Sequence, residues 1–77
     1  MYVLVMYRND YTGNYGGRQY VYKTWMPLVP GDIVVAPTWK GDAPAKVFAI
    51  EIPEESISPD ILPTVREITE YYLEDDE

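Results

Sequence analysis

The sequence predicts a small α+β domain that is mainly β: a curled antiparallel sheet or partly open, SH3-like barrel of four to five strands, with a C-terminal helix. Short apolar runs rich in β-branched and aromatic residues recur along the first 52 residues, and prolines and glycines separate them. The 77-residue length fits one domain. We place this domain at residues 1–73 and expect an acidic, disordered tail at residues 74–77.

The first two strands are predicted at residues 2–7 and 19–25. The first run is almost wholly apolar, which predicts a strand buried on both faces. Residues 8–19 contain glycine, asparagine and aspartate, which tolerate a positive φ, so we expect a long loop there. Tyrosines alternate with other residues from position 20, which is the pattern of a second strand.

Two further strands are separated by turns. Residues 29–32 read Val-Pro-Gly-Asp, a sequence typical of a β-turn. Residues 33–36 then predict a short buried strand that ends at Pro37. Residues 39–44 predict another turn, and the alternation over residues 45–52 predicts a further strand.

The C-terminal part, after an acidic linker at residues 53–60, admits two structures. A helix at residues 64–73 is favoured, because Thr64 and Glu67 have the spacing of a capping box. Four apolar side chains also fall at helical spacing: Ile61, Val65, Ile68 and Tyr72. A last strand is the alternative, because several of these residues are β-branched.

Charge is distributed unevenly along the chain. Residues 1–50 carry five bases and three acids, whereas residues 51–77 carry one base and ten acids, for a net charge of −7. This total disfavours nucleic acid as a direct ligand. The apolar start stops at Arg8, which is too short for a membrane span or a signal peptide, so we expect no membrane partner and a cytoplasmic location.

The sequence contains neither histidine nor cysteine, so it lacks the common nucleophilic dyads and the commonest transition-metal ligands. Its glycines do not form a phosphate-binding loop. We therefore expect a protein that is not an enzyme, with no catalytic residue, no metal and no cofactor.

The region from residue 20 to residue 52 carries a Tyr-x-Tyr pair, a Pro-Gly-Asp turn, and a strand that ends in proline before another strand. This pattern resembles small, uncharacterised accessory proteins of bacteriophages. It is similar, more distantly, to the N-terminal β-domain of the replication-restart helicase, which binds the end of a DNA strand. The resemblance implies a β-domain of phage origin, acting in the host cytoplasm. We carry over neither DNA binding nor any functional residue.

The polar, glycine-rich loop predicts a recognition surface. Tyr11 and Tyr15 stand in it, with Arg18 beside them. Tyrosine offers a large contact area at low entropic cost, and glycine lets a loop adapt to its partner. The alternative is that these rings fold back over a small core.

Acidic residues predict a second contact surface. On the expected helix, Glu67, Glu70 and Glu74 would line one face and imitate the charge of phosphates. The leading hypothesis is therefore a non-catalytic, phage-encoded inhibitor that binds a protein with a basic surface. By analogy, its target would be a host nucleic-acid-handling or defence complex, as for an anti-CRISPR protein. A soluble, functionally neutral acidic face is the alternative.

Two other functions stay open. One is a single-stranded nucleic-acid-binding accessory protein of phage replication, with aromatic rings to stack bases and lysines to contact phosphates. Its candidate residues are Tyr20, Tyr22, Lys23, Trp25, Trp39 and Lys40. For the two tryptophans, covering the core is the favoured interpretation and a binding surface is the alternative. The other function is a structural or assembly subunit that forms a homodimer through an exposed strand edge or apolar patch.

Overall fold

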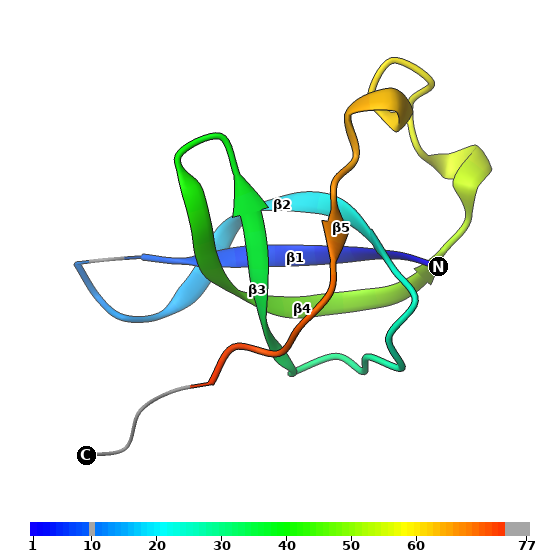
Figure 1. The fold of residues 1–77 in the computed structure, drawn as a ribbon. Helices are drawn as coiled ribbons and strands as arrows, with labels where there is room; N and C mark the ends of the chain where they lie inside the picture. The colour runs from blue at the N-terminus through cyan, green and yellow to red at the C-terminus, as the bar shows by residue number, and fades with distance from the viewer. Residues whose placement is uncertain (10, 74–77) are drawn as a thin grey trace.

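The protein forms one open, five-stranded mixed sheet, seen in a computed structural model that describes residues 1–9 and 11–73 (Figure 1). The strands are β1 (Tyr2–Arg8), β2 (Tyr15–Thr24), β3 (Ile33–Thr38), β4 (Gly41–Ile52) and β5 (Glu67–Ile68), in the order β3-β4-β1-β2-β5. Two short 3₁₀ helices, η1 (Glu54–Ser56) and η2 (Leu62–Thr64), lie between β4 and β5. A small, mainly β domain is thus confirmed. Within the described residues, no helix has the length and apolar character needed to cross a bilayer.

The core lies on one face of the curled sheet. Val3 and Val5 from β1 are fully buried, and they pack with Val34 from β3, Val47 from β4 and Ile68 from β5. Burial of each such side chain stabilises the fold by about 1.5–3 kcal/mol. The prediction that β1 is buried on both faces is wrong, because its alternate residues are only half-buried. No second layer of the described chain fully covers that outer face.

The loop before β2 is shorter than predicted. β2 already begins at Tyr15 and includes both of the following glycines. The connection closes within a few residues, because the Asn9 N–H donates to Asn14 O (2.7 Å) and the Gly13 N–H donates to Asn9 O (2.7 Å). Gly13 has a φ of +76°, a conformation that glycine adopts without strain.

The turn predicted at residues 29–32 is confirmed by the Asp32 N–H, which donates to Val29 O (3.1 Å). The turn predicted at residues 39–44 is present but shorter, because only residues 39 and 40 separate β3 from β4, and both strands contain prolines. The Val35 N–H donates to Glu70 O, away from β4 (3.1 Å). By alternation, the nitrogen of Pro37 also faces away from β4, so its missing N–H removes no bond of that ladder.

The C-terminal helix predicted at residues 64–73 is wrong. Instead, the Lys23 N–H of β2 donates to Arg66 O (3.0 Å), and β5 pairs in parallel with β2, which makes the sheet mixed rather than antiparallel. Four residues after the end of β5, the chain is bonded to β3, where the Tyr72 N–H donates to Ile33 O (3.0 Å). The segment therefore satisfies backbone groups of two sheet edges and buries Ile68 completely, which outweighs a marginal helical preference.

Candidate functional site

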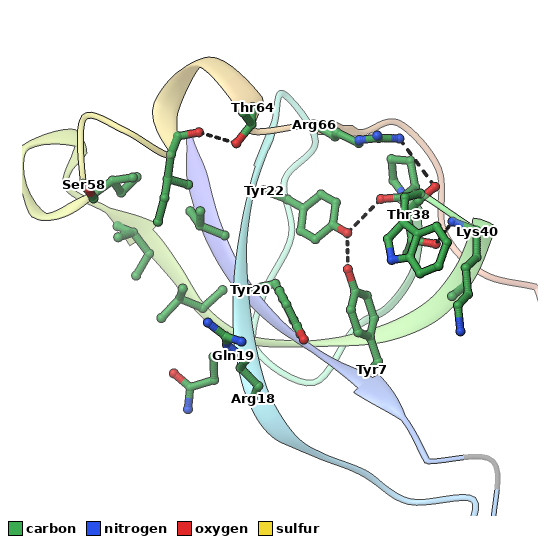
Figure 2. A pocket seen from close by; sticks show the side chains of 18 of the residues that line it. Tyr7, Arg18, Gln19, Tyr20, Tyr22, Thr38, Lys40, Ser58, Thr64 and Arg66 are labelled. Carbon is green, nitrogen blue, oxygen red and sulfur yellow. Dashed lines mark hydrogen bonds between the residues drawn. The ribbon is translucent and has the colours of Figure 1, made fainter.

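A groove of about 880 Å³ follows β2 on the open side of the sheet. The β3–β4 hairpin stands on one side of it, and the segment with η1 and η2 stands on the other (Figure 1). The groove has this shape because, in the described part of the chain, β5 pairs with the edge of β2 opposite β1 only at Lys23 and Thr24, and the rest of that edge stays open. Figure 2 shows the side chains that line it.

The side chains of β2 alternate across its plane and divide the groove into two halves. Tyr20 and Tyr22 are paired with Val5 and Val3, so they share the core side of the sheet. Val21 is paired with Leu4 and lies on the opposite, outer side, as does Gln19. Figure 2 shows this separation, with the tyrosines on one side of the ribbon and Gln19 on the other.

Tyr22 is the fixed centre of the half on the core side, which we call the aromatic half. It is buried, and its hydroxyl donates to Pro37 O (2.8 Å). Because this uses its only proton, the Tyr22 oxygen accepts from the Tyr7 hydroxyl. Burial, together with the hydrogen bond from Tyr7, raises the pKa of Tyr22 well above its ordinary value of 10.0. Tyr22 thus supports the groove and offers no free ring for stacking.

Two other rings of the aromatic half are accessible. Tyr20 is 37% exposed and stacks on Tyr7 in a tilted arrangement, with ring centroids 4.6 Å apart. Trp39, in the tight turn between β3 and β4, is 82% exposed. The Arg18 guanidinium lies 5.8 Å from the Tyr20 ring centre, and the Lys40 ammonium lies 5.1 Å from the Trp39 ring centre. Each exposed ring is therefore accompanied by a cation.

The groove is strongly positive for a protein of net charge −7. Four of the six lysines and arginines line it: Arg8, Arg18, Lys40 and Arg66. Within residues 1–9 and 11–73, no aspartate or glutamate lines it. Arg66 also connects the two walls, because its guanidinium donates to Thr38 O in β3 (3.4 Å). The opposite half is apolar and contains Leu4, Val21, Ile52, Ile57 and Ile61.

The structure brings together only some of the residues that the sequence predicts for a site. Tyr20, Trp39, Lys40 and Arg18 line the groove. Trp25 is 73% exposed, but it lies with Lys23 in a separate hollow of about 280 Å³. The favoured prediction that both tryptophans cover the core is wrong, because both are exposed.

The predicted protein-binding residues are dispersed. Tyr11 is 98% exposed near the end of the β1–β2 hairpin, whereas Tyr15 is half-buried at the start of β2. Glu67 and Glu70 are exposed, but they share no helical face because the helix does not form. Glu74 and the tail predicted at residues 74–77 lie outside the described residues.

Of the aromatic and charged residues that line the groove, three were not predicted: Tyr7, Arg8 and Arg66. Tyr7 follows Val3 and Val5 at a spacing of two, which is the signal that could have placed it on the core side. Arg66 could not be placed before the pairing of β5 was known.

In the described part of the chain, no group of three or more histidine, cysteine, aspartate or glutamate residues could hold a metal ion. Comparison of the chain with family models, with curated proteins and with solved structures found no match.

Proposed function

We propose that this protein is a non-catalytic binder of single-stranded nucleic acid, and that the aromatic half of the groove is its binding site. The observation that carries this proposal is the composition of the lining: four cations without a carboxylate among the described residues. Such a lining attracts a polyanion locally, even though the chain as a whole is acidic.

The exposed rings favour an unpaired strand over a duplex. Trp39 and Tyr20 each present an aromatic surface next to a cation. Unpaired bases stack on such rings while neighbouring cations contact the phosphates, and this combination binds single strands with little sequence preference. A duplex keeps its bases stacked inside and cannot use the rings in this way.

The architecture proposed for this function is a partly open, SH3-like barrel. Its support is the pair of hydrogen bonds by which residues 70–72 reach β3 from the β5 edge. These bonds curl the sheet and hold the two walls of the groove in place. The phage origin and the host-cytoplasmic location implied by the sequence pattern fit an accessory role in phage replication.

One specific observation still supports the inhibitor hypothesis. Tyr11 is 98% exposed, and its N–H donates to Asn9 Oδ1 (2.8 Å), as expected of a recognition anchor on a supported loop. The acidic, phosphate-like helical face that gave this hypothesis its target does not exist, because residues 67–68 form β5. We therefore keep inhibition of a host complex as the second candidate.

The two exposed tryptophans provide a matched test. Binding of fluorescein-labelled dT12 and rU12 is measured by fluorescence anisotropy for the wild type, Trp39→Ala and Trp25→Ala. Loss of a stacking ring costs about 1–3 kcal/mol, so Trp39→Ala should weaken binding by about 5- to 150-fold. Trp25→Ala should have no effect, because Trp25 lies outside the groove. Equal affinity of all three proteins, or no binding by the wild type, would exclude the proposal.

A further inference from the structure

The edge of β2 that faces the groove carries backbone groups without a strand partner. The Thr24 N–H donates toward β1, to Met1 O (2.9 Å), whereas the Lys23 N–H donates away from β1, to Arg66 O (3.0 Å). By the alternation of an antiparallel ladder, the N–H and C=O groups of Val21 and Gln19 also point away from β1. Within the part of the chain that the structure describes, no strand lies beside them.

The protein already uses this edge for strand pairing. β5 pairs with β2 in parallel at Lys23 and Thr24. The chain just before β5 turns away through η2, so the row occupied by β5 is empty beside Val21 and Gln19. An unpaired edge of this kind is a template for an added strand.

The two halves of the groove define what such a strand would carry. Side chains of an added strand alternate between the two faces of the sheet. One set would meet the apolar half, where Leu4, Ile57 and Ile61 lie. The other set would meet the positive aromatic half, with Arg18 and Arg66. The complementary sequence therefore alternates apolar and acidic residues.

We propose that the free edge of β2 binds an extended segment of a partner protein by strand addition, and that this segment alternates apolar and acidic residues. A second copy of this chain fits the site poorly. Its own β2 would bring another Arg18 and Lys23 to a groove that is already positive. The proposal adds a protein ligand beside the nucleic-acid site. Its strand pairing uses the backbone of residues 19 and 21, whereas its acidic side chains would share Arg18 and Arg66 with the nucleic-acid site.

The probe is the synthetic peptide GEVEVEVEG, tested by isothermal titration calorimetry and by NMR of the ¹⁵N-labelled protein. Binding should shift the amide signals of Gln19 and Val21 and slow their hydrogen exchange. A version of the peptide that is N-methylated at alternate residues keeps its charges but cannot pair with an edge, so it should not bind. Equal binding of the methylated peptide would overturn strand addition, as would binding of GKVKVKVKG with the same affinity.

Protein variants test the same edge. Gln19→Pro removes an outward N–H that makes no bond to β1, and it should weaken peptide binding by about two- to tenfold. Gln19→Ala keeps this N–H and should bind as the wild type does. Unchanged dT12 binding by both variants would show that the nucleic-acid site is intact, so failure of one proposal remains distinguishable from failure of the other. Light scattering tests whether a second copy of this chain occupies the edge instead. A stable dimer of the free protein would overturn the proposal that the edge binds a partner protein.

Discussion

Replacing Lys40 by glutamine should flatten the dependence of oligonucleotide binding on salt. Each phosphate that a cation neutralises on a single strand contributes about −0.7 to the slope of log K against log salt concentration. Four cations line the groove, so the wild-type slope should reach about −2.8 at most. Between 50 and 200 mM salt, this corresponds to a loss of affinity of about 50-fold. Without Lys40, the slope should fall to about −2.1 and the loss to about 18-fold.

Lys46 provides the matched control for this measurement. It is exposed on β4 and does not line the groove, so Lys46→Gln removes the same total charge from a different place. Anisotropy titrations of dT12 at four or more salt concentrations give the three slopes. If both variants change the slope equally, net charge rather than the groove governs binding. A wild-type slope near zero would refute an electrostatic contribution from the groove altogether.

Three further predictions concern stability. The free energy of unfolding should fall above pH 10.0, because Tyr22 ionises in the unfolded chain while its raised pKa keeps it protonated in the fold. The loss of stability is at most about 1.4 kcal/mol per pH unit. Denaturant titrations of Tyr22→Phe should not show this loss. Thr24→Val should lower the free energy of unfolding by about 1–3 kcal/mol, measured by thermal unfolding. The reason is that the buried Thr24 hydroxyl donates to Ile68 O (2.9 Å) and accepts from the Met26 N–H (3.0 Å). An unchanged Tm would contradict this anchoring role. Tyr11→Ala should leave Tm unchanged, because the ring is 98% exposed; a large loss would mean that this ring packs on the core.

The existence of β1 and β3 was predictable from sequence, because both are apolar runs rich in β-branched residues. Which face is buried was not predictable, because the apolar residues are contiguous: Val3, Val5 and Val34 are fully buried, whereas the residues that alternate with them are only half-buried. The strand ends were less predictable, because proline and glycine were taken as breaks. Pro37 is accommodated where its nitrogen faces away from β4, and this orientation depends on register rather than on composition.

The last segment shows why local pattern was insufficient at the C-terminus. Ile61, Val65, Ile68 and Tyr72 fit a helical face in the sequence, but only Ile68 is fully buried in the fold. The Thr64 hydroxyl donates to Ile61 O (2.8 Å) rather than capping a helix. The deciding interactions are backbone bonds to β2 and β3, strands that lie more than 30 residues earlier in the chain. The spacing of apolar residues within a short segment carries no information about hydrogen-bond partners so far away in the sequence.

The same long-range pairing explains how an acidic chain forms a positive groove. The sequence divides into a slightly basic part and a strongly acidic part, and Arg66 is the single base of the acidic part. Pairing of β5 with β2 brings Arg66 to the groove, where Arg8, Arg18 and Lys40 of the basic part already lie. Glu67, its neighbour in sequence, is exposed and does not line the groove. At physiological ionic strength, charges more than about 8 Å apart on the surface are largely screened. We therefore expect a ligand in the groove to respond mainly to these four cations, which is why we propose nucleic acid as a ligand although the net charge of −7 disfavours it.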